Sequence, residues 1–293
     1  MTIDIPPSIV EYLDQNIKGR VALIGCRAQD VEISFECCEY DIALLDPYDP
    51  LDRVVELEDS VIEFLNFSSR GNQHHMQLES MIPIGYKNMP LFSPSFNSTN
   101  VSRDRIFIGQ AKKMIVNSLF NIERADSHNE SKVEFSSLHL KLAAYHLLEG
   151  ILLCSGIRPM PTHELNQIRT LDEPNQAFAT AIKSGLECLG IERASKTTIN
   201  RSYKALKEIL REEDDKHLIF SKIEHLLENG LLADCYYFIG KVGMKYLDRK
   251  STTFAELYPK LSKITFDLNL DIGLIRKTSS MLKDSCKMIL KSE

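Results

Sequence analysis

The spacing of hydrophobic residues changes near residue 105, and this change constrains the fold more than any other feature of the chain. Before it, apolar residues come in short runs separated by Gly, Pro, Asn and Asp, as in short strands joined by turns. After it, they recur every three to four residues, as in amphipathic helices. A chain of 293 residues also exceeds what one compact core usually fills. The sequence therefore predicts an α+β protein: a mixed-sheet domain followed by an all-α helical bundle.

The predicted first domain spans residues 1–104. It opens with a helix, because Ser8-x-x-Glu11 fits a capping box and Ile9, Leu13 and Ile17 share a helical face. Apolar runs bounded by turn residues then predict three or four strands, over Val21–Ile24, Tyr40–Leu45, Val54–Glu58 and Val61–Phe67. Residues 68–104 are rich in Pro, Ser and Asn, which favours a connector.

The predicted helical domain spans residues 105–293, with a bundle over 105–190 and additional helices over 191–293. Glycines mark the predicted helix ends, at Gly156, Gly190 and Gly230. Residues that suit N-caps precede the predicted helix starts, at Thr162, Asp172, Ser195, Asp215 and Asp271.

The composition favours a cytoplasmic protein. Residues 1–7 lack the basic and apolar regions of a signal peptide, and four polar residues interrupt the most apolar stretch, Leu138–Gly156. Seven cysteines without a C-x-x-C pair suit a reducing compartment. We therefore expect no membrane partner.

The net charge differs between the two predicted domains. Residues 1–104 carry 7 Lys and Arg against 17 Asp and Glu, a net charge of −10, whereas the remainder carries 28 against 24, a net charge of +4. An acidic domain does not attract polyanions by its overall charge. A phosphate-bearing ligand of this domain would need divalent cations, or basic groups from the helical domain.

Three carboxylates are the candidate metal ligands. Glu39 and Asp41 are two residues apart at a predicted strand and therefore point to the same face. A neighbouring strand offers Glu63 as a third ligand, with Asp59 as second choice. Clustered carboxylates suit Mg²⁺, which binds oxygen ligands and shares them with substrate phosphates.

This stretch resembles the polymerase-beta-type nucleotidyltransferases, whose signature is an apolar strand, Gly-Ser, an interval and Asp-x-Asp. Gly25, Ala28 and Asp41 match it, whereas Cys26 replaces the serine and Glu39 the first aspartate. The resemblance implies that Mg²⁺ bound by Glu39, Asp41 and Glu63 supports transfer of a nucleoside monophosphate from a nucleoside triphosphate, ATP first among them. Gly25 and Cys26 would then lie near the triphosphate. The acceptor, an RNA or a protein, stays open.

The stretch Gly156–Arg169 resembles the higher-eukaryote-and-prokaryote nucleotide-binding (HEPN) family and the C-terminal domain of aminoglycoside nucleotidyltransferases. Ribonuclease members of the HEPN family carry Arg, four to six residues, then His, and Arg158 and His163 have this spacing. The resemblance implies that Arg158 holds a phosphate and that His163 accepts a ribose proton. A homodimer through the helical domain is a separate expectation. Glu149 is a further candidate base.

Other interpretations remain open. Glu39, Asp41 and Glu63 could be ordinary solvent-facing strand residues. The first domain could also be a catalytically degenerate nucleotide-binding or interaction module, and the helical domain a ribonuclease. Cys37 and Cys38 suggest a soft-metal site, but no second cysteine pair or nearby histidine completes it.

Overall fold

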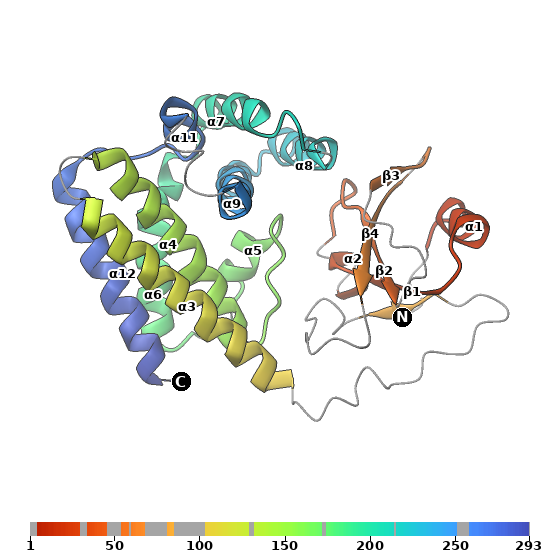
Figure 1. Cartoon of the computed structure of the whole chain (residues 1–293), viewed down its shortest axis with the longest axis horizontal. Helices are drawn as coiled ribbons and strands as arrows, with labels where there is room; N and C mark the ends of the chain where they lie inside the picture. The colour runs from red at the N-terminus through yellow and green to blue at the C-terminus, as the bar shows by residue number, and fades with distance from the viewer. Residues whose placement is uncertain are drawn as a thin grey trace. The chain divides into compact units, whose positions relative to one another are not determined.

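The computed structural model describes residues 5–29, 34–45, 54–58, 60–67, 81–84, 103–128, 132–171, 174–213, 215–250 and 258–292. The chain forms two compact units: residues 1–106 with 213–222, and residues 107–212 with 223–293 (Figure 1). A mixed sheet together with many helices confirms the predicted α+β class. The sequence placed the boundary after residue 104, and it did not predict that residues 213–222 belong to the first unit.

The first unit is built on a five-stranded sheet. Its strands are β1 (Arg20–Ile24), β2 (Tyr40–Leu45), β3 (Val54–Glu56), β4 (Val61–Phe67) and β5 (Ile82–Pro83). They lie in the order β3-β4-β2-β1-β5, with β2 and β4 parallel and the other neighbours antiparallel. The two central pairs, β1 with β2 and β2 with β4, bring together the segments that carry the candidate site.

Each face of this sheet has its own apolar cluster, because side chains alternate along a strand. On one face, Ile42 and Phe64 pack with Ile9 and Leu13 of helix α1 (Pro7–Asn16). The other face carries a smaller cluster made of Ala22, Ile24, Ala43, Leu45 and Phe67. Asp41 comes two residues before Ala43 on β2, and Glu63 pairs with Asp41, so both side chains point to this second face. They lie at one end of its small apolar cluster.

Several details of the first unit differ from the prediction. Helix α1 has Pro6 at its N-cap and Pro7 in its first turn, so the Ser8 capping box is wrong. Proline suits this position because its missing N–H would have no helical partner. Strand β3 ends at Glu56 rather than Glu58. The short helix α2 (Cys26–Gln29) and β5 were not predicted, and most of the expected connector lies outside the described residues.

The second unit is helical. Its elements, two of which begin in residues of the first unit, are α3 (Arg103–His128), α4 (Val133–Cys154), α5 (Glu164–Arg169), α6 (Gln176–Leu189), the 3-10 helix η4 (Ile191–Arg193), α7 (Lys196–Ile209), α8 (Lys216–Glu228), α9 (Leu232–Lys250), α11 (Pro259–Thr265) and α12 (Ile272–Ser292). Helix α4 is buried on nearly all sides, since other helices of this unit surround it. No helix among the described residues is long and apolar enough to cross a membrane.

The predicted helix ends are largely confirmed. Gly156, Gly190 and Gly230 all have the positive φ that favours glycine after a helix. Ser195 and Asp271 accept hydrogen bonds from the backbone of the helices that they precede. The Thr162 cap is wrong, because α5 begins at Glu164 with His163 as its N-cap. Asp172 lies outside the described residues.

One apolar core joins helices from before and after residue 190, without residues of α7 or α8. It includes Leu148 and Leu152 of α4 together with Tyr237 of α9 and Leu282 of α12. The subdivision expected at residue 190 therefore has no counterpart in the core, because later helices bury the same central helix as the earlier ones.

A candidate metal centre

Gly25 opens the candidate site, in the turn between β1 and α2. Its φ of +79° is a conformation that other residues rarely adopt. A Cβ atom at this position would overlap the carboxylate of Asp41. Glycine is therefore required here for two reasons: the backbone conformation, and the close approach of Asp41, which pairs with Ile24 across β1 and β2.

Strand register brings the second and third carboxylates together. Asp41 of β2 lies directly opposite Glu63 of β4, the parallel neighbour. Residues directly opposite one another on neighbouring strands point to the same face, because the pleats of adjacent strands are in phase. The structure thus places Glu63 beside Asp41. Asp59, the second choice for this position, lies outside the described residues.

Arg27 fixes the segment that carries Glu39. Its guanidinium donates hydrogen bonds from Nε (3.0 Å) and Nη2 (2.7 Å) to the carbonyl oxygen of Cys38, and further bonds to the carbonyls of Phe35 and Glu36. The guanidinium also stacks 4.2 Å from the ring centre of Tyr40. A side chain of α2 therefore holds the backbone before Glu39 and packs on the side chain that follows it.

The three carboxylates form one cluster. One oxygen each of Glu39, Asp41 and Glu63 lies within 4.8 Å of the others. Glu39 is 8% exposed, and its Oε2 has no hydrogen-bond partner among the described residues. A buried carboxylate oxygen without a partner is costly, so it points to a ligand.

Burial and mutual repulsion disfavour the charged carboxylates. Burial is the main cause that raises the pKa of Asp41 well above its usual range, and the charges of Glu39 and Glu63 raise it further. Burial, followed by the charge of Glu39, likewise raises the pKa of Glu63. Such a cluster gains stability from any cation placed between its oxygens.

Lys222 supplies one cation to the cluster. It belongs to segment 213–222 of the same unit, and its Nζ lies 2.6 Å from Glu39 Oε1. Burial opposes the charged amine, but the charges of Glu39 and Asp41 outweigh burial and raise the pKa of Lys222. With all four groups ionised, three negative charges face one positive charge. The remaining charge of −2 matches one divalent cation.

The donor set fits magnesium. All three carboxylates offer hard oxygen ligands, which Mg²⁺ prefers, and the unpartnered Oε2 of Glu39 is one of them. Cys26, which was expected near a triphosphate, begins α2 next to Gly25 and is buried. The roles of Gly25 and Cys26 in nucleotide binding stay predictions.

Of the helical candidates, Arg158 and His163 lie in the turn between α4 and α5, whereas Glu149 lies within α4. Gln167 stabilises this turn, because its amide donates to the carbonyl of Arg158 and accepts from the N–H of Met160. The side chains of Arg158 and His163 are both buried. Glu149 is bound to Lys241 at 2.6 Å. The roles of Arg158, His163 and Glu149 in RNA or acceptor chemistry stay predictions.

Sequence reasoning missed Lys222 and Arg27. Lys222 is separated from Glu39 by 183 positions, and no local pattern distinguishes it from other helical lysines. Arg27 follows the Gly-Cys turn directly and could have been considered as an anchor for the interval before Glu39. Comparisons with protein-family models, with curated proteins and with solved structures found no match.

Proposed function

We propose that the first unit binds Mg²⁺ through Glu39, Asp41 and Glu63 and transfers a nucleoside monophosphate from a nucleoside triphosphate to an acceptor. One observation carries this proposal: the three carboxylates share a cluster beside the Gly25 turn, with their oxygens within 4.8 Å. The fit to a hard divalent cation supports metal binding. The triphosphate is proposed from the resemblance of the Gly25 and Asp41 segments to nucleotidyltransferases.

The order of the elements supports the comparison. An apolar strand leads to Gly25, a short helix follows, and the returning strand β2 carries Asp41. The parallel neighbour β4 adds Glu63. This order agrees with the signature of an apolar strand, a glycine turn and a carboxylate strand. The family itself is an inference from these residues.

The proposed reaction joins an acceptor oxygen to the α-phosphorus of the nucleotide. The bond from that phosphorus to the bridging oxygen breaks, pyrophosphate leaves, and the acceptor proton passes to solvent. Bound Mg²⁺ would supply neutralisation of phosphate charge. The protein's own part is to hold the three carboxylates together. Strand register and the Arg27 contacts position them, and the missing side chain of Gly25 leaves space for the Asp41 carboxylate.

A second candidate is a nucleotide-binding module without catalysis. The ion pair between Lys222 and Glu39 favours it, because an internal cation already satisfies one carboxylate oxygen. The departures from the signature, Cys26 for serine and Glu39 for aspartate, agree with it. On this interpretation, nucleotide binds but no pyrophosphate is released.

Calorimetry tests both candidates. The full chain is titrated with ATP, GTP, CTP and UTP, each with and without Mg²⁺, beside Asp41→Asn and a control, Glu11→Gln, at an exposed position of α1. Magnesium-dependent binding that Asp41→Asn loses and Glu11→Gln keeps supports the metal site. Pyrophosphate release with RNA or protein acceptors then separates transfer from binding alone. Absence of any nucleotide binding would overturn both candidates, whereas nucleotide binding that does not depend on Mg²⁺ would reject only the metal-dependent transfer.

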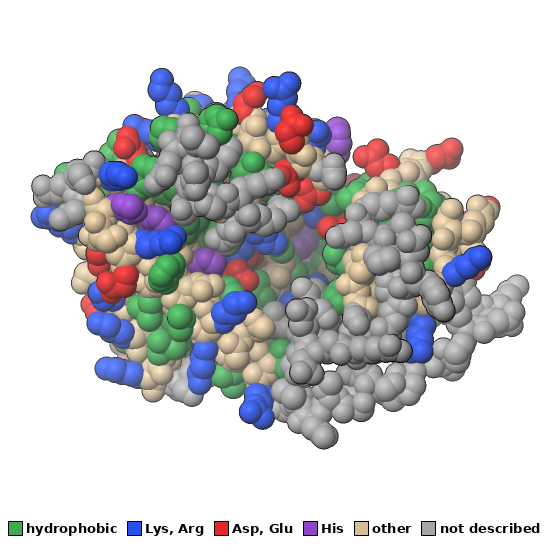
Figure 2. All heavy atoms as spheres, viewed as in Figure 1, with side chains coloured by type: hydrophobic (Ala, Val, Ile, Leu, Met, Phe, Trp, Pro, Cys, Tyr) green, Lys and Arg blue, Asp and Glu red, His purple; other side chains and the backbone are tan. Residues whose placement is uncertain are grey.

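RNA cleavage and homodimer formation by the helical unit stay predictions. On the face drawn in Figure 2, the Lys and Arg side chains of the helical unit are dispersed among other side chains rather than gathered in one patch. If the purified chain cleaves RNA, Arg158→Ala and His163→Ala should abolish cleavage. Unchanged cleavage in both variants would reject the ribonuclease hypothesis.

A further inference from the structure

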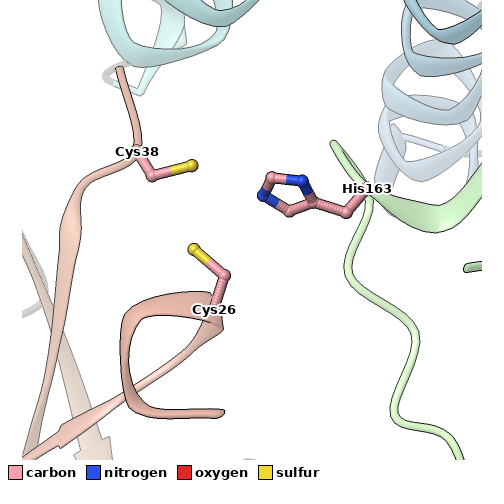
Figure 3. A group of neighbouring side chains, drawn as sticks. All are labelled: Cys26, Cys38 and His163. Carbon is pink, nitrogen blue, oxygen red and sulfur yellow. The ribbon is translucent and has the colours of Figure 1, made fainter. Parts of the chain in front are cut away.

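Two thiols of the first unit lie together beside the carboxylate cluster. Cys26 begins α2, and Cys38 directly precedes Glu39. Their Sγ atoms lie within 4.8 Å of one another, and Cys38 has side-chain hydrogen bonds to both Cys26 and Cys37. Figure 3 shows both side chains directed into the same space. His163, also drawn there, belongs to the helical unit and is not part of this pair.

The backbone around the pair is fixed in place. Arg27, the residue after Cys26, donates two hydrogen bonds to the carbonyl of Cys38. The N–H of Cys38 donates to the carbonyl of Phe35 at 3.0 Å. A link therefore already joins α2 to residue 38, and it keeps the two sulfur atoms within 4.8 Å of one another. A disulfide would bring them to about 2.05 Å.

We infer that Cys26 and Cys38 form a reversible disulfide, and that this bond is a modification site next to the carboxylate cluster. The oxidant is a small disulfide such as oxidised glutathione. One protein thiolate attacks it and releases one reduced glutathione. The second protein thiolate then attacks the mixed disulfide and releases another. The protein loses two electrons and two protons, and two glutathione molecules gain them.

Cys37 is the competing partner, but it is the less suitable one. It is adjacent to Cys38 in sequence, so a bond between them would close a small strained ring, whereas Cys26 approaches Cys38 from a separate element. The remaining cysteines, Cys154, Cys188, Cys235 and Cys286, belong to the helical unit. Within the first unit, the structure thus favours one pairing.

The bond would also act on the proposed metal site, and this consequence rests on the proposed function. Glu39 follows Cys38 directly, so pulling Cys38 toward α2 changes the direction of the Glu39 side chain. Oxidation should therefore lower the affinity of the cluster for Mg²⁺. Formation of the disulfide itself does not depend on metal binding.

The test is an equilibrium titration of the full chain with reduced and oxidised glutathione, followed by acid quench and trypsin digestion without reductant. Trypsin cuts after Arg20, Arg27 and Arg53. A bond between Cys26 and Cys38 therefore joins peptide 21–27 to peptide 28–53, whereas a bond between Cys37 and Cys38 stays within peptide 28–53. The same titration in concentrated urea gives the unfolded reference.

We expect the joined peptides in the wild type and in Cys37→Ser, and their absence in Cys26→Ser and Cys38→Ser. The equilibrium constant of the native protein should exceed that in urea by about tenfold or more, because the fold holds the thiols together. An equal constant, or a bond confined to peptide 28–53, would overturn the inference. Disulfide formation without any change in Mg²⁺ binding would reject only its effect on the metal site.

Discussion

The carboxylate of Asp41 lies so close to the backbone of Gly25 that a Cβ atom at residue 25 would overlap Asp41 Oδ2. The backbone of the turn after β1 and the carboxylate of Asp41 on β2 therefore depend on one another for their positions. A chain that needed only a turn could place an asparagine here. The contact with Asp41 is what restricts the position to glycine, and it links local backbone conformation to the candidate metal centre.

Gly25→Ala should destabilise the first unit by about 2 kcal/mol or more, since positive φ and a steric clash both act against alanine. Gly230→Ala is the matched control, because Gly230 has a φ of +71° and open space around its missing Cβ. Gly230→Ala should lower the free energy of unfolding by about 1 kcal/mol. Hydrogen exchange of peptides from β1 and α8 measures the two effects. Equal costs would show that the contact with Asp41 is unimportant.

Asp41→Asn should stabilise the first unit without metal at neutral pH. The raised pKa of Asp41 means that the folded state holds a proton which the unfolded chain, with a pKa of about 3.9, has lost. The unfolding free energy of the wild type therefore falls as pH rises above that value. The unfolding free energy of the Asp41→Asn variant should fall less over the same pH range. Hydrogen exchange of β2 peptides at about pH 5 and about pH 8, in a chelator, checks this sign.

Lys222→Met should destabilise the first unit by about 3 kcal/mol, because it leaves the buried Glu39 carboxylate without its cation. Mg²⁺ should restore much of this loss if it binds the same carboxylate. The control, Lys260→Met, removes an exposed lysine of α11 and should change little. Loss of stability that Mg²⁺ does not restore would argue that Lys222 and the metal do not share Glu39.

The helical unit should lose stability as pH falls from about 6.5 toward 4. Burial, then the charges of His128 and Arg124, lowers the pKa of His139 to about 4, and burial does the same for His146. Between these values the unfolded chain binds protons that the folded unit excludes, so acid favours unfolding. His139→Gln, which keeps a donor for Asn121, should reduce this dependence. Hydrogen exchange of α4 peptides that shows no acid sensitivity would contradict the prediction.

The sequence was sufficient where structure depends on neighbouring residues. Strand β2 was predicted with its observed bounds because an apolar run lies between polar segments. The spacing predicted that Glu39 and Asp41 lie close together, which they do, although Glu39 precedes the first residue of β2. The apolar surroundings of Glu63 placed it in the adjacent strand. Gly156 and Gly190 marked helix ends because a positive φ selects glycine directly.

The sequence was insufficient where structure depends on distant residues or on weak local signals. Strand β5 has two residues, one of them proline, and only its pairing with β1 defines it. The ion pair of Lys222 with Glu39 depends on tertiary packing, which no local pattern encodes. Ser8 fitted a capping box, but the prolines at positions 6 and 7 start the helix instead.

A titration with Mn²⁺, followed by electron paramagnetic resonance, tests the central claim most directly, because Mn²⁺ accepts the same carboxylate ligands as Mg²⁺ and its free signal disappears on binding. We expect saturable binding in the wild type and in Glu11→Gln, displacement by Mg²⁺, and loss of binding in Asp41→Asn. Unchanged Mn²⁺ binding in Asp41→Asn, or no binding in the wild type, would contradict the assignment of Glu39, Asp41 and Glu63 as a metal centre.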